Sequence, residues 1–161
     1  MFDMTTLTVL HTAISLIATA AGFVVVADLM RARSSAAWLP VFLVTAFITS
    51  ASGFLFPFNG VLPSHVVGVL ALVTLVLVVV ARRASPPWRG VEVAGLVASQ
   101  FFLVFVGVAQ LFTKVPAFQQ LAPTQSEPPF AVAVLLVLGS FVAVGIASIS
   151  ALRRASRGLT A

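Results

Sequence analysis

Five long apolar runs dominate the chain, and most polar residues lie in the short segments between them. The runs cover residues 5–29, 37–56, 65–81, 91–112 and 130–152. About 20 helical residues, each rising about 1.5 Å, cross about 30 Å of hydrocarbon. In lipid only helices and closed barrels satisfy every backbone N–H and C=O group, and these runs lack the alternation of barrel strands. The pattern predicts an all-α fold, a polytopic transmembrane helix bundle with five spans, formed by residues 1–161 as a single domain.

The composition supports a membrane protein. Of the 161 residues, 60% are hydrophobic and 8% are charged, and the mean hydropathy is +1.16. Soluble domains carry about 25% charged residues. The chain has no cysteine, which excludes disulfides and thiolate metal sites.

The basic residues are unevenly distributed between the two sides that five spans create. Eight arginines follow the first, third and fifth runs, whereas Lys114 follows the fourth. The positive-inside rule then places the N-terminus outside and the C-terminus in the cytoplasm. A net charge of +5 in this arrangement indicates anionic lipid headgroups as partners, and no nucleic acid.

The longest link, TKVPAFQQLAPTQSEPPF, joins the fourth and fifth runs. Thr124 and Glu127 fit a capping box, or Ser126 fits an N-cap followed by Glu127 and two prolines in the first turn. Both alternatives start the fifth helix here. Phe118 and Leu121 indicate a link that folds back onto the bundle. We expect it to lie over the external helix ends and to cover a polar pocket between the first, third and fourth spans.

Polar residues of the fourth run share one helix face. At about 100° per residue, Glu92, Ser99, Gln110 and Lys114 fall near one line. An unpaired amide in hydrocarbon costs roughly 2–7 kcal/mol, so this face is predicted to turn toward protein. An ion pair of Glu92 with Arg89 and an interhelical hydrogen bond of Gln110 are the structural interpretation. A small-solute or proton pathway is the functional one.

His11 and His65 are the two histidines of the chain, and the predicted topology brings both to the external side. Two imidazoles on different helices can ligate a haem iron, whereas a closed zinc site needs four ligands. The candidate cofactor-binding residues are His11 and His65, with Gln110, Lys114 and Glu127 as polar neighbours. Haem b is the leading cofactor, and a quinone or a divalent metal is the alternative. A structural, hydrogen-bonded role fits both histidines as well. The sequence shows no arrangement typical of hydrolytic or nucleophilic catalysis.

Small residues recur at intervals of four along the fifth run. Gly139, Ala143, Ala147 and Ala151 form this pattern. Small residues allow helix backbones to approach closely in a membrane. They predict a packing seam, either within the bundle or toward a partner subunit or a second copy of the chain.

The region of His11 and the segments FLFPFNGVLPSH (54–65) and QLFTKVPAFQQLAPTQSEPPF (110–130) carry a resemblance that extends over nearly the whole chain. The chain resembles small, uncharacterised multi-pass integral membrane proteins of bacteria. The resemblance implies a location in the bacterial inner membrane and, because these proteins have no established activity, implies no catalytic residue. Three functions stay open: an accessory or structural membrane subunit, a redox protein that binds haem, metal or quinone at its external face, and a small-solute or proton pathway.

Overall fold

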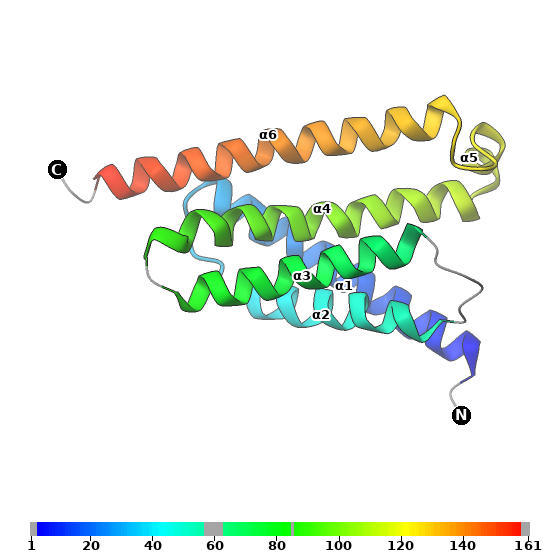
Figure 1. The fold of residues 1–161 in the computed structure, drawn as a ribbon, viewed down its shortest axis with the longest axis horizontal. Helices are drawn as coiled ribbons and strands as arrows, with labels where there is room; N and C mark the ends of the chain where they lie inside the picture. Colours follow the sequence, from blue (N-terminus) through cyan, green and yellow to red (C-terminus); the bar gives the residue numbers. More distant parts are fainter. Residues whose placement is uncertain (1–2, 57–62, 85, 159–161) are drawn as a thin grey trace.

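The computed structural model describes residues 3–56, 63–84 and 86–158, and every regular element in these ranges is helical (Figure 1). The elements in chain order are α1 (Met4–Met30), α2 (Trp38–Ser52), the 3₁₀ turn η1 (Gly53–Leu55), α3 (Pro63–Arg83), the 3₁₀ turn η2 (Pro86–Trp88), α4 (Arg89–Lys114), α5 (Pro116–Leu121) and α6 (Pro128–Gly158). Five of the helices, with η1 extending α2, are long and apolar enough to cross a membrane. The prediction of an all-helical chain with five candidate spans is confirmed.

Prolines mark the beginning of most helices. Pro40 lies in the first turn of α2, and α3, α5 and α6 begin at Pro63, Pro116 and Pro128. Proline lacks an N–H group, but the first N–H groups of a helix have no intrahelical acceptor in any case. Proline therefore starts these helices without losing a hydrogen bond, and it allows the short helix α5, which the sequence analysis did not predict, to form inside the longest link.

Helix α6 continues six residues beyond the expected end at residue 152. The added segment, 153–158, contains alanine and three arginines, which are good helix formers, and the Ser156 hydroxyl donates to the carbonyl of Leu152 at 3.0 Å. At about 1.5 Å per residue the 31 residues of α6 measure about 46 Å, more than the hydrocarbon thickness. The arginines of its last turns therefore lie on an extension of the helix past the apolar region.

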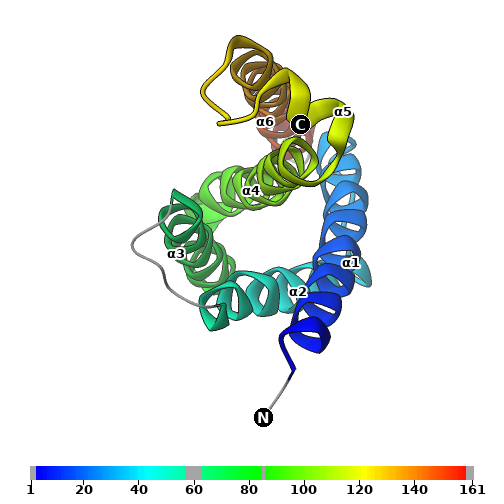
Figure 2. The same ribbon diagram turned by 90° about the vertical axis from the view of Figure 1, so that its right-hand side faces the viewer.

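The first four long helices form a ring, and α6 lies outside it (Figure 2). Helix α1 packs against α2, α3 packs against α4, and α4 also packs against α1. The contact between α2 and α3 is the least extensive in the ring. Helix α6 packs on α4 and α1, and α5 packs on α4. Helices α1 and α3 are separated across the ring by α2 and α4.

The arginines are segregated along the bundle axis. The C-terminal ends of α1, α3 and α6 and the N-terminal end of α4 lie together, on the left of Figure 1. We call this the arginine end, and the opposite end, which holds the beginning of α1 and α3 and the link 115–127, the histidine end. The arginine end carries Arg31, Arg33, Arg82, Arg83, Arg89, Arg153, Arg154 and Arg157.

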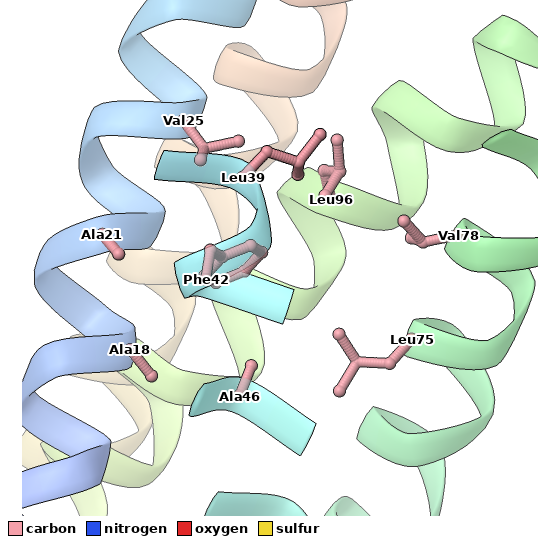
Figure 3. Close-up of a cluster of buried hydrophobic side chains, with 9 residues drawn as sticks. All are labelled: Ala18, Ala21, Val25, Leu39, Phe42, Ala46, Leu75, Val78 and Leu96. Carbon is pink, nitrogen blue, oxygen red and sulfur yellow. The ribbon is translucent and has the colours of Figure 1, made fainter. Parts of the chain in front are cut away.

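The hydrophobic core lies in the half of the bundle next to the arginine end. Figure 3 shows its buried residues: Ala18, Ala21, Val25, Leu39, Phe42, Ala46, Leu75, Val78 and Leu96. In α1 the buried residues begin only at Ala18, and in α6 they are Ser148 and Ala151. Helices α3 and α4 approach closely here, because a Cβ atom at Gly95 would lie 2.6 Å from Val78 Cγ2. The bundle is tightly packed in this half and has more exposed side chains toward the histidine end.

Candidate functional site

The most deeply buried polar side chain belongs to Gln100, near the middle of α4. It is fully buried, and its Nε2 donates to the backbone carbonyl of Thr19 on α1 at 3.0 Å. Its amide oxygen has no hydrogen-bond partner in the described structure. A buried acceptor without a partner carries a desolvation cost of about 1–3 kcal/mol. Packing alone therefore does not explain why a glutamine is present at position 100.

Gly22 makes room for this amide. A Cβ atom at position 22 would lie 1.8 Å from Gln100 Oε1 and 2.7 Å from Phe42 Cε2. The amide oxygen thus occupies the place in which any other side chain would begin. Glycine at this position lets α1, α2 and α4 meet around a single polar group.

Polar side chains lead from Gln100 toward the histidine end along α1. The Thr19 hydroxyl donates to the Ser15 carbonyl at 2.8 Å, and the Ser15 hydroxyl donates to the His11 carbonyl at 2.6 Å. Both hydroxyls are bonded within their own helix, which is the usual way for a serine or threonine to satisfy its proton in an apolar environment. Residues 11, 15 and 19 lie four apart, so one face of α1 is polar from His11 to Thr19.

His11 is fixed by α2. Its Nδ1 lies 2.8 Å from Ser52 Oγ, and its ring packs edge-to-face on Phe56 with centroids 5.3 Å apart. The Ser52 hydroxyl also lies 3.2 Å from the Thr49 carbonyl, which accepts its proton. Serine has one proton to donate, so both bonds form together only when His11 carries its proton on Nδ1. In that tautomer Nε2 presents its lone pair, as in imidazoles that bind metal or haem.

His65 lies at the same end of the bundle but has different neighbours. Its ring is tilted on Phe54, with centroids 5.9 Å apart. Each imidazole thus packs on an aromatic ring of the segment that ends α2, and the helices that carry the two histidines do not pack against each other. Among the described residues, no group of three or more His, Asp or Glu side chains could hold a metal ion.

The expected polar neighbours are spread over the histidine end. Gln110 and Lys114 are exposed on the last turns of α4. Gln110 was expected to turn toward protein and to form an interhelical hydrogen bond. It is exposed because the bundle buries few side chains beyond Gln100 in this direction.

The polar residues that were predicted to share one face of α4 do not form a continuous interior face. Glu92 pairs with Arg82 at 2.7 Å, not with Arg89 as expected, because the short connection to α3 brings the end of that helix beside the start of α4. Ser99 is buried, and its hydroxyl has no hydrogen-bond partner among the described residues. With Gln110 and Lys114 exposed, these groups do not line a common path in the described residues.

Glu127 organises the turn before α6. Its carboxylate accepts hydrogen bonds from the hydroxyl of Thr124 at 2.9 Å and from the backbone N–H groups of Thr124 and Ser126 at 3.3 and 3.2 Å. Desolvation acts to raise the pKa of Glu127, but these hydrogen bonds, with one from its own backbone, hold the pKa below its usual value. The turn is stabilised by the ionised carboxylate.

Both capping alternatives need correction. Thr124 and Glu127 interact as in half of a capping box, but α6 begins only at Pro128, and the Glu127 carbonyl accepts the first helical bonds from Phe130 and Ala131. A residue before proline avoids the helical conformation. The two prolines therefore move the helix start past Thr124 and Ser126.

The link that contains this turn lies against α4 and α6. The Gln125 amide donates to the Ala109 carbonyl at 2.9 Å and to the Thr113 hydroxyl at 2.7 Å. Phe112 packs on the rings of Phe118 and Phe130. A hollow of about 250 Å³ lies between the link and the end of α4. The link folds back as expected, but α5 and α3 lie on opposite sides of α4 (Figure 2), so it does not cover the expected pocket between spans one, three and four.

Gln100 is the residue that the sequence analysis missed. The polar line along α4 passes through Ser99, and Gln100 lies about 100° away from it. Two features of the sequence point to Gln100. An amide in the middle of an apolar run is costly to bury, and the first run carries a glycine, Gly22, at a similar position along the bundle.

No protein-family model matches the chain, and no curated protein or solved structure is significantly similar to it. The structure defines a class, a bundle of apolar helices compatible with a membrane protein.

Proposed function

We propose that the chain is an integral protein of the bacterial inner membrane and acts as an accessory subunit that binds a partner membrane helix along the outer face of α6. The arginine end lies in the cytoplasm in this proposal, which puts the N-terminus and both histidines on the external side. Insertion is supported by the five apolar helices, and orientation is supported by the segregation of the arginines.

The outer face of α6 carries the proposal. Gly139, Ala143 and Ala147 are exposed, and a Cβ atom at Gly139 would meet nothing within 4 Å. Lipid-facing positions gain nothing from being small, whereas small residues let a second helix approach closely. These three positions of the predicted seam are therefore available to a partner and are not used within the bundle.

Ala151 does not belong to this exposed seam, because it is buried. Steps of four residues advance about 400°, so the pattern turns about 40° per step and about 120° over its full length. The last member thereby rotates toward the rest of the bundle. On the inner side of α6, Phe141 packs on Phe101, and a Cβ atom at Gly145 would touch Val97.

Photocrosslinking in native membranes tests the proposal. A photoreactive residue at Ala143 is expected to yield a discrete protein adduct, and a matched one at Val69, exposed on α3, is expected to yield lipid adducts alone. A Gly139→Leu substitution should abolish the Ala143 adduct. Lipid adducts alone from both positions would overturn the proposal.

The geometry of His11 favours one second function, a redox protein with haem b, or else a quinone, at the histidine end. Ser52 holds one ring nitrogen and leaves the other for a ligand. A haem absorption band in protein purified from its native membrane, lost in His11→Ala, supports this function. Loss in His65→Ala as well indicates two axial ligands. A colourless preparation without quinone removes it.

A further inference from the structure

An apolar groove runs between α2 and α3 on the outside of the bundle. Its volume is about 480 Å³, within the range of about 300–1,000 Å³ typical of small-molecule sites. Leu43 and Leu75 form its floor, since Leu75 belongs to the core and Leu43 packs against it. The walls are exposed apolar side chains: Val44, Phe47, Ile48, Val76 and Val80. The groove exists because α2 and α3 form the least extensive contact in the ring.

Among the described residues, Arg83 is the one charged residue that lines this groove, and it lies at the arginine end. Arg83 is the last residue of α3, about one turn past Val79. Its neighbour Arg82 is engaged by Glu92 at 2.7 Å. Within the described residues, Arg83 makes no ion pair or hydrogen bond. An apolar groove thus ends at an exposed guanidinium that no described acidic side chain neutralises.

The depth of the groove matches the layers of a lipid leaflet. Trp38 begins α2 and is exposed, as expected of an indole at the membrane interface. The groove begins at Leu43, about 7.5 Å further along the helix, and the distance along α3 from Leu75 to Arg83 is about 12 Å. The end of the groove at Arg83 therefore lies near the level of the lipid headgroups, and its apolar part lies at the level of the acyl chains.

We propose that this groove binds an anionic phospholipid, with an acyl chain along Leu43 and Leu75 and the headgroup phosphate on Arg83. A guanidinium matches phosphate oxygens with paired hydrogen bonds. The surrounding arginines favour a headgroup whose phosphate charge is not balanced by its own cation. A partner helix is about 10 Å wide and would need an acidic residue opposite Arg83. One phospholipid supplies both an apolar acyl chain and a negative charge. The inference rests on bilayer insertion, but not on a partner at α6.

Native mass spectrometry of the full chain, with phosphatidylglycerol and phosphatidylcholine of equal chain length, tests the charge. The wild type should retain phosphatidylglycerol in preference to phosphatidylcholine. Arg83→Gln should lower that preference about tenfold, as expected for one charge-assisted pair. Arg154→Gln makes the same charge change on α6, outside the groove, and should leave the preference unchanged. Equal losses in both variants would show a general surface charge effect and overturn the site.

A second variant tests the groove itself. Val76→Phe fills it with a larger exposed side chain and leaves Arg83 in place, so retention of both lipids should fall. Thermal unfolding of each variant checks that the fold is kept. Unchanged lipid retention in a folded Val76→Phe protein would overturn the proposal, as would a protein partner recovered at this groove in place of lipid. The Ala143 crosslink should persist in Arg83→Gln, which separates failure of this site from failure of the partner surface.

Discussion

The amide oxygen of Gln100 on α4 occupies the space that the missing side chain of Gly22 leaves on α1. A Cβ atom at position 22 would lie 1.8 Å from that oxygen. Helices α1 and α4 are far apart in the sequence but are complementary at this point. A polar group on α4 fills the space beside a glycine on α1. This relationship sets how closely α1 and α4 approach in the middle of the bundle.

Gly22→Ala should destabilise the folded chain by about 1–3 kcal/mol, as overpacking of a close contact does. Both the amide of Gln100 and the ring of Phe42 would have to move. Unfolding in mixed detergent micelles measures the change. Gly139→Ala is the matched control, because a Cβ atom there meets nothing within 4 Å, and it should raise stability by about 0.5–1 kcal/mol, since alanine is the better helix former. Equal effects of the two substitutions would contradict the contact.

The amide of Gln100 should contribute little net stability. Gln100→Met keeps the unbranched shape, loses one hydrogen bond of about 0.6 kcal/mol and removes an unpartnered acceptor whose burial costs about 1–3 kcal/mol. We expect stability to be unchanged or to rise by up to about 2 kcal/mol in the same unfolding assay. A loss of more than about 1 kcal/mol would mean that the oxygen has a partner after all.

The number of long helices could be predicted from the sequence because each apolar run has the length of a membrane span. The position of the tightly packed core along the helices could not be predicted, since the runs are about equally apolar along their whole length. The structure concentrates the core around Phe42, Leu75 and Leu96, near the arginine end. That distribution left Gln110 exposed and Gln100 buried, although both are amides on the same helix.

The candidate site was predictable only in part. Charge and topology predicted that His11 and His65 share one end of the bundle. Their contacts with Ser52, Phe54 and Phe56 depend on how α2 ends in a 3₁₀ turn, and periodicity does not report that geometry. The start of α6 was similarly decided by the conformational effect of two prolines on Glu127, which overrode the capping signals.

Ala32, two residues after the end of α1, has a backbone conformation that favours glycine. Its φ is 51°, and the N–H groups of Ala32 and Arg33 bond to the carbonyls of Leu29 and Asp28 in a Schellman motif. A left-handed alanine costs about 1–2 kcal/mol. Ala32→Gly should therefore raise stability by up to about 1 kcal/mol, measured by thermal unfolding, while Ala36→Gly, outside the motif, should not. A destabilised Ala32→Gly protein would contradict the positive φ.

The turn before α6 should depend on pH through Glu127. The pKa of this carboxyl is lower in the folded chain than in the unfolded one, because the ionised form accepts hydrogen bonds from Thr124 and Ser126. A lowered pKa means that the stabilisation is complete above the pKa of an unfolded glutamate and is lost as pH falls through the lowered value. The turn should therefore stay formed at neutral pH and loosen only in acid.

Carboxyl ¹³C NMR of Glu127 in nanodiscs, between about pH 2 and pH 7, measures this titration. Thr124→Val removes the hydroxyl donor and keeps the backbone N–H, so the pKa of Glu127 should move up toward its usual value. Ser140→Ala removes a hydroxyl that bonds within α6, to the Leu136 carbonyl, and should leave the titration unchanged. If Glu127 titrates at its usual value in the wild type and does not respond to Thr124→Val, the carboxylate does not hold the turn, and the prolines alone determine where α6 begins.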